Sequence, residues 1–190
     1  INYFNMKKKL LLHSCCAPCS IYVLQQLMSE WQVTVYFYDP NIHPRAEYIQ
    51  RRDEMKGYAK KLKITFIEGP YDSFNWIQKT RGLEKEPEKG KRCDVCFDIR
   101  LGETARKAKD ESYDAFATVL TISPHKNAKQ ISLIGQRIAE KFEIDFLDRD
   151  WKKNEGFKIA CKLSEEEGFY RQDYCGCLFS KRNRDLKAKL

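Results

Sequence analysis

Seven of the eight cysteines in this chain of 190 residues fall into three short groups. The groups are Cys15, Cys16 and Cys19 in "HSCCAPCS", Cys93 and Cys96 in "RCDVC", and Cys175 and Cys177 in "YCGC". Cysteine thiolates bind zinc, iron and iron–sulfur clusters, and a pair separated by two residues also forms redox dithiols. The eighth, Cys161, lies in a helical pattern, so we expect it to pack rather than to bind metal.

The number of thiols bears on three interpretations. A dithiol oxidoreductase needs one pair, such as Cys16 and Cys19, and leaves the other clustered thiols without a role. Two CxxC pairs have the spacing of a structural zinc site, but four thiolates complete it and three remain. Seven thiols therefore favour a four-thiolate iron–sulfur cluster with a second metal site beside it. The sequence does not show which cysteines bind the cluster and which bind the second metal. Asp39 and Asp94 are possible oxygen ligands, although Asp39 is ordinarily a turn residue and Asp94 a helix cap.

Composition narrows the class of protein. The net charge of +8 favours an acidic partner, most often nucleic acid, although a solvated basic surface explains it equally well. The chain has no apolar run long enough to span a membrane, and the apolar part of "KKKLLLHSCC" is too short for a signal peptide. We expect a cytoplasmic protein, where clustered cysteines indicate metal or redox use. Residues 1–5 precede Met6, and we interpret them as a leader.

Strand and helix patterns alternate along the chain. Short β-branched and apolar runs predict strands at 9–14, 33–38, 64–67, 114–120 and 144–147. Helical patterns cover 20–30, 45–62, 94–109 and the segment through Ile131 and Phe142. This alternation predicts a mostly parallel, doubly wound, Rossmann-like α/β sheet. We expect one domain over residues 6–190, with its metal site at the carboxyl ends of the strands.

Polar residues follow several of these strands. Ser14 ends strand 9–14 and the first cysteines follow it. Asn41 and His43 follow the second strand, and His125 and Lys126 follow strand 114–120. Ligands of open parallel sheets bind at this edge, so we expect these loops to form one site. No glycine-rich phosphate loop is present, so no motif supports nicotinamide or ATP binding. The candidate substrate-binding residues are Asn41, His43, His125, Lys126, Arg92 and Arg171. His13 lies inside a strand, and we expect it to pack in the core.

Five motifs resemble the QueH-type epoxyqueuosine reductases. They are "HSCCAPCS", "YDPNIHP", "RCDVCFDIRL", "TISPHKN" and "YRQDYCGCLFS", in this order from about residue 10 to residue 180. One departure is Asp39, which stands where the second motif more usually has asparagine. The fold implied by the resemblance is similar to the nucleotide alpha hydrolase and ATP-pyrophosphatase group, with the nucleotide motif replaced.

The resemblance also implies an activity and its cofactors. Family members reduce epoxyqueuosine to queuosine at the wobble position of tRNA, an oxidoreductase reaction of queuosine biosynthesis. It implies a 4Fe-4S cluster and an additional iron ion, no cobalamin, an external electron donor and no membrane. The metal ligands then fall among the seven clustered cysteines. No catalytic residue is named by the motifs.

Two other functions account for part of the pattern. A zinc-structured RNA-binding protein without catalysis explains the basic charge and the CxxC pairs, and it would hold zinc without acid-labile sulfide. A CxxC dithiol oxidoreductase would lose activity on Cys16→Ala or Cys19→Ala and tolerate Cys175→Ala.

Overall fold

The computed structural model describes residues 7–189, and the leader assigned to residues 1–5 lies outside them. Five strands form one sheet: β1 (Lys9–His13), β2 (Gln32–Phe37), β3 (Thr65–Glu68), β4 (Ala115–Thr118) and β5 (Asp145–Phe146). Their order is β3-β2-β1-β4-β5, and every neighbouring pair is parallel. The predicted doubly wound α/β fold is confirmed.

The central strand β1 is buried from both faces. Leu10, Leu11 and Leu12 are fully buried, and Leu11 is in register with Thr34 of β2 and Phe116 of β4. A strand covered on both faces needs side chains that are apolar on both sides, which the run "KLLLH" supplies after its first residue. This strand therefore forms the middle of the hydrophobic core.

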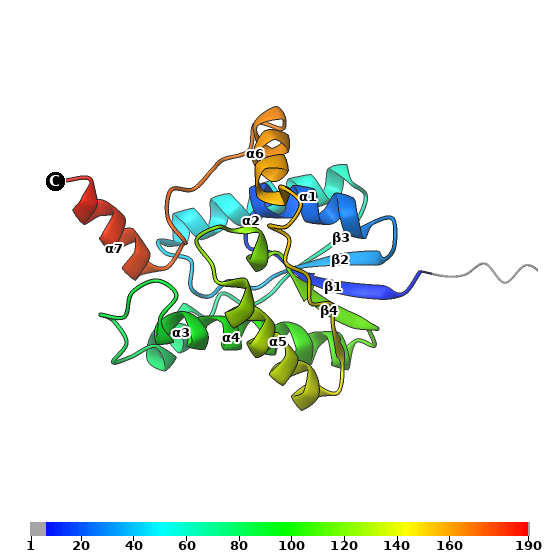
Figure 1. Ribbon diagram of the computed structural model, residues 1–190, viewed down its shortest axis with the longest axis horizontal. Helices are drawn as coiled ribbons and strands as arrows, with labels where there is room; N and C mark the ends of the chain where they lie inside the picture. Colours follow the sequence, from blue (N-terminus) through cyan, green and yellow to red (C-terminus); the bar gives the residue numbers. More distant parts are fainter. Residues whose placement is uncertain (1–6, 190) are drawn as a thin grey trace, which may run out of the picture.

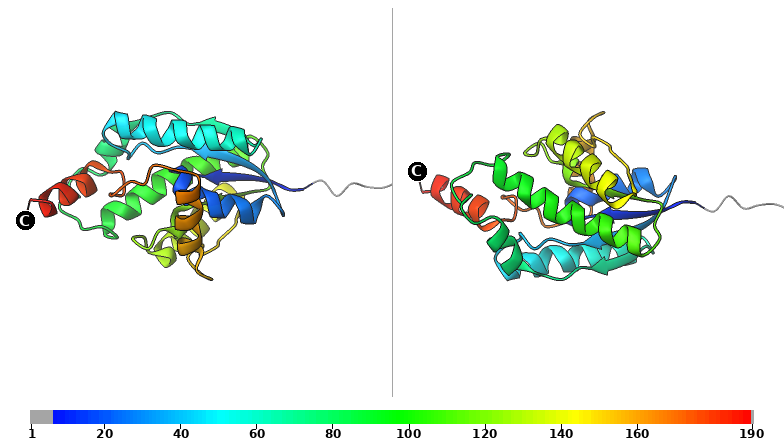
Figure 2. Two further views of the ribbon diagram at one scale, coloured as in Figure 1. Left: turned by 90° about the horizontal axis from the view of Figure 1, so that it is seen from above. Right: turned by 90° about the horizontal axis from the view of Figure 1, so that it is seen from below.

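Helices cover both faces of the sheet (Figures 1 and 2). One layer holds α1 (Ala17–Leu27), α2 (Arg45–Lys61) and α6 (Gly156–Glu166), and the other holds α3 (Ser73–Lys79), α4 (Lys91–Asp110) and α5 (Ala128–Phe142). The short 3-10 helix η1 (Leu120–Ile122) follows β4, and α7 (Leu178–Lys187) lies at the end of the molecule near the carboxyl edge of the sheet. No helix in residues 7–189 is long and apolar enough to cross a membrane.

Most element boundaries differ from the predicted ones by one to three residues. The strand predicted over 114–120 ends at Thr118, after which the backbone turns into η1. Helix α4 begins at Lys91, three residues before the predicted start. Helix α3 was not predicted, because it is short and Trp76 is its one buried residue, so it has no apolar periodicity.

Candidate metal centre

The carboxyl edge of the sheet has a switch point between β1 and β4. From β1 the chain proceeds to β2 and β3 on one side, while β4 and β5 lie on the other. Connections that leave in opposite directions open a crevice at this position, where ligands of such sheets bind. The loop after β1 carries Cys15, and the loop after η1 carries Lys126, so both reach this crevice.

The first group of cysteines is compact. The sulfur atoms of Cys15, Cys16 and Cys19 all lie within 4.8 Å of one another. Cys16 is the residue before α1, and Cys19 lies in its first turn, where the positive end of the helix dipole favours thiolates. Hydrogen bonds from Cys16 and Cys19 lower the pKa of Cys15. The hydrogen bond with Cys15 in turn raises the pKa of Cys19 to about 12. Gln172 donates a further bond to Cys16 Sγ at 3.3 Å.

The remaining four clustered cysteines come from two distant parts of the chain. Cys93 and Cys96 lie in the first two turns of α4, and Cys175 and Cys177 directly precede α7. Burial, with smaller contributions from the nearby Cys175 and Cys177, raises the pKa of Cys93 to about 11 and that of Cys96 to about 12. The four thiols are therefore near enough to interact through their charges.

Arg51 of α2 holds the segment that carries Cys175 and Cys177. Its guanidinium is almost fully buried and donates to the carbonyl oxygens of Cys175 at 3.3 Å and Tyr174 at 3.4 Å. Its Nε donates to Glu47 Oε1 at 2.7 Å, which compensates the buried charge. A charged donor satisfies these loop carbonyls away from water, so the segment is fixed to α2 without any secondary structure of its own.

Gly176, between the two cysteines, has the backbone conformation that only glycine adopts without strain. Its φ is +120°, and an added Cβ would lie 3.1 Å from Arg51 Nη1 and 3.2 Å from Ile42 Cγ1. We expect Gly176→Ala to cost about 1–3 kcal/mol of stability and to lower the iron content, because it strains the loop and displaces Arg51. Gly102→Ala on α4 is the matched control, since its Cβ meets nothing within 4 Å.

Urea denaturation and iron analysis of the two variants measure this prediction. Gly102→Ala should raise stability by about 0.5–1 kcal/mol, since alanine is the better helix former. Equal stability of Gly176→Ala and the unsubstituted protein would show that the loop relaxes without cost.

A buried network of charged and polar groups lies beneath the cysteines. Arg100 is one helical turn beyond Cys96 on α4, and it forms an ion pair with the fully buried Asp39 of the loop after β2. Its Nε donates to His13 Nε2 at 3.3 Å, and His13 Nδ1 is 2.9 Å from Thr118 Oγ1. Because Nε2 accepts a hydrogen bond from Arg100, the His13 ring carries its proton on Nδ1. The packed role expected for His13 thus includes a hydrogen bond at each ring nitrogen.

The predicted substrate-binding residues are not equally placed. Lys126 is half-buried, and burial by itself lowers its pKa. The nearby Cys175, Cys15 and Cys19 outweigh this effect and raise the pKa of Lys126. The ammonium group therefore lies near the first and the third group of cysteines. His125 and Arg171 are exposed, and Arg171 donates to Cys161 Sγ at 3.1 Å.

The structure gives Arg92 a different place from the expected one. Its side chain is 2% exposed and donates to the carbonyl oxygens of Leu83, Glu84 and Glu86. Its guanidinium also lies 4.8 Å from the centre of the Phe179 ring. Arg92 therefore organises the loop before α4, and its charge partly opposes the rise in the pKa of the neighbouring Cys93.

Buried polar atoms without partners gather around the cysteines. In residues 7–189, seven buried side-chain N or O atoms have no hydrogen-bond partner, and four of them belong to Asp39, Asn41, His43 and Gln172. His43 Nδ1 donates to the Asn41 carbonyl at 2.7 Å, which leaves Nε2 as an acceptor. All eight cysteines are free thiols. Free thiols beside unsatisfied acceptors fit a site that holds groups in addition to the protein chain.

Three residues of this arrangement were not singled out from the sequence: Arg51, Arg100 and Gln172. Arg100 carried one usable signal, since it lies four residues after Cys96 and thus on the same face of α4. Arg51 and Gln172 act on cysteines more than 120 residues away in the chain, and the sequence contains no signal for these contacts.

The fold resembles that of a known tRNA-modifying protein. The U34-tRNA thiolase NcsA from Methanococcus maripaludis, solved with its [4Fe-4S] cluster, superimposes with a TM-score of 0.57 at 11% sequence identity. The match covers 97% of this chain and 66% of that one. This likeness supports the predicted doubly wound α/β fold. Fold and site together define a parallel α/β protein with a cysteine-rich centre at the carboxyl edge of its sheet.

Sequence comparison then identifies the family. Residues 10–183 match the family described as epoxyqueuosine reductase QueH, and this chain belongs to that family. The epoxyqueuosine reductase QueH of Haemophilus influenzae is 44% identical over 92% of this chain and 72% of its own length. Those of Streptococcus pyogenes serotype M1 and Thermotoga maritima are 40% and 33% identical, over 96% and 93% of this chain and 74% and 92% of their own. The resemblance seen in the five motifs is confirmed, and with it the enzyme class, an oxidoreductase.

Proposed function

We propose that this protein reduces epoxyqueuosine to queuosine at the wobble position of tRNA. The observation that supports the proposal is the compact group of Cys15, Cys16 and Cys19 at the carboxyl edge of the sheet, in a chain of this family. Cys93, Cys96, Cys175 and Cys177 form a second set, near enough to one another to interact through their charges. The net charge of +8 suits a tRNA substrate, and the proposal includes a cytoplasmic location for the reaction.

The cofactors of the proposal are a 4Fe-4S cluster and a separate iron ion, without cobalamin. Cys93, Cys96, Cys175 and Cys177 supply four thiolates, the usual number for such a cluster. Cys15, Cys16 and Cys19 supply three more for the separate iron. When bound, these groups supply single electrons and a Lewis acid for the epoxide oxygen. The electrons come from an external donor.

The chain's own residues bind and orient the substrate. Removing the epoxide oxygen as water consumes two electrons and two protons. The half-buried Lys126 holds a positive charge beside Cys15, Cys19 and Cys175 during this reaction. Asn41 Oδ1 and His43 Nε2 are acceptors that suit the hydroxyl groups of the modified base. His125 and Arg171 are both exposed, and their side chains suit contacts with the phosphates of the anticodon loop.

The test is metal analysis followed by turnover, on protein purified without oxygen. We expect about four acid-labile sulfides and more than four irons per chain, and conversion of epoxyqueuosine in tRNA to queuosine with a chemical reductant. Nucleoside mass spectrometry of digested tRNA measures the conversion. Zinc without sulfide would instead support the RNA-binding protein. Turnover that needs Cys16 and Cys19 but survives Cys175→Ala would support the dithiol oxidoreductase.

A further inference from the structure

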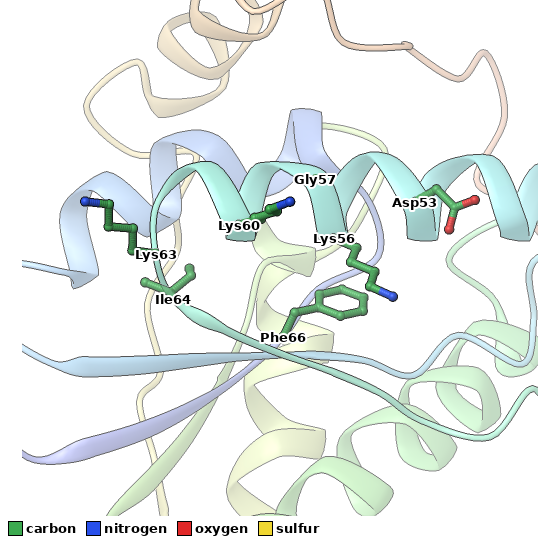
Figure 3. A pocket seen from close by; sticks show the side chains of 7 residues that line it. All are labelled: Asp53, Lys56, Gly57, Lys60, Lys63, Ile64 and Phe66. Carbon is green, nitrogen blue, oxygen red and sulfur yellow. The ribbon is translucent and has the colours of Figure 1, made fainter.

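A second surface feature lies away from the cysteines, between α2 and the edge strand β3. It is a shallow hollow of about 650 Å³ (Figure 3). Its lining residues are Asp53, Lys56, Gly57, Lys60, Lys63, Ile64 and Phe66. Strand β3 pairs with β2 alone among the described strands, so its outer side and the adjoining face of α2 remain open.

The charge of this hollow comes from three lysines. Lys56, Lys60 and Lys63 are spaced by four and three residues, which places their side chains along one side of α2 and its end. All three are exposed, and none forms an ion pair with any residue between 7 and 189. Two nearby basic residues are neutralised by ion pairs. Arg52 pairs with Asp53 and Glu68, and Lys61 pairs with Glu167. The Asp53 carboxylate in the lining is the partner of Arg52, so the three ammonium groups stay uncompensated.

The floor of the hollow is apolar and partly exposed. Phe66 and Ile64 are half-buried, and Figure 3 shows the Phe66 ring below α2, close to the Lys56 side chain. Gly57 leaves space on the helix side, because an added Cβ would meet nothing within 4 Å. Cationic groups around a partly exposed aromatic ring are the combination that binds phosphates together with a base or ribose face.

The position of the hollow relates it to the proposed site. Helix α2 begins at Arg45, two residues after His43, and runs away from the cysteines. Lys56 and Lys60 lie about 16 and 22 Å further along the helix axis. A ligand in the hollow is thus too far away to react at the cysteines, but a long anionic molecule can occupy both places.

We propose that this hollow binds the sugar-phosphate backbone of the tRNA substrate outside the anticodon loop. The inference rests on the proposed function, because that function makes tRNA the polyanion at the cysteines. Lys56, Lys60 and Lys63 contact phosphates, and Phe66 packs against a ribose or base. Binding there adds affinity for the whole tRNA without touching the nucleotide that reacts.

The test is the affinity of the metal-loaded protein for an unmodified tRNA transcript, measured by fluorescence anisotropy over a range of salt concentrations. The double variant Lys56→Gln/Lys60→Gln should bind about 5- to 10-fold more weakly, and the slope of log K against log salt should fall by about 1 for each lysine. Lys109→Gln/Lys141→Gln is the matched control, since both lysines are exposed on the opposite layer. It loses the same charge and should stay within about twofold.

A neutral variant tests the shape of the hollow. Gly57→Gln adds a side chain without a change of charge, and we expect weaker tRNA binding with an unchanged salt slope, while Gly57→Ala should bind as the unsubstituted protein does. Equal losses in the two double variants, or no loss in Lys56→Gln/Lys60→Gln, would overturn the proposal. Because the transcript carries no epoxyqueuosine, this result is independent of turnover, and a failed proposed function would appear in the turnover assay alone.

Discussion

Cys177→Ser is expected to abolish turnover and to remove most of the acid-labile sulfide, while the protein remains folded. The serine hydroxyl can replace the thiol as the cap of α7, where Cys177 Sγ now accepts from the Ser180 amide at 3.4 Å. A neutral hydroxyl is a poor ligand for iron in place of a thiolate. The variant thus separates the structural role of Cys177 from metal binding, and we expect the rate to fall by more than about 100-fold.

Cys161→Ser is the matched control for this prediction. Cys161 contacts Arg171 and lies outside the three cysteine groups, so its loss should leave sulfide, iron and turnover unchanged. Iron and sulfide per chain, the visible absorption and the turnover rate are measured on both variants after purification without oxygen. Full sulfide content and turnover in Cys177→Ser would remove Cys177 from the proposed ligands.

Asp39→Ala is expected to be the most destabilising single substitution in the network beneath the cysteines. It leaves the guanidinium of Arg100, which is 1% exposed, without its carboxylate partner. Breaking a buried ion pair from one side costs about 3–5 kcal/mol, because one charge stays buried and uncompensated. The loss should also lower iron content, since Arg100 links the middle of α4 to the end of β1 and to the loop after β2.

Asp39→Asn separates the charge from the hydrogen bond. The asparagine oxygen still accepts from Arg100, so we expect a smaller cost of about 1–3 kcal/mol. Urea denaturation of both variants gives the comparison, with iron measured on the same samples. An Asp39→Ala protein as stable as the unsubstituted one would show that other groups compensate the Arg100 charge.

Several features of this protein could be predicted from its sequence because they depend on neighbouring residues. The buried run before Cys15 and the alternation of strands with helices predicted the parallel sheet, which the structure confirms. The five motifs identified the family, which the comparisons confirm. A strand or a helix leaves a periodic pattern in consecutive side chains, so these local signals were sufficient.

Other features were decided by contacts between residues far apart in the chain. Arg100 meets Asp39 across 61 residues, and Arg51 fixes the Cys175 segment across 124. Hydrogen bonds to the loop before α4, together with the distant Phe179 ring, buried Arg92, although its position before Cys93 suggested a substrate contact. Such contacts depend on how the sheet order brings loops together and on which buried charges need a partner. Local sequence patterns contain neither, so only the tertiary structure could show how the cysteine groups are held beside each other.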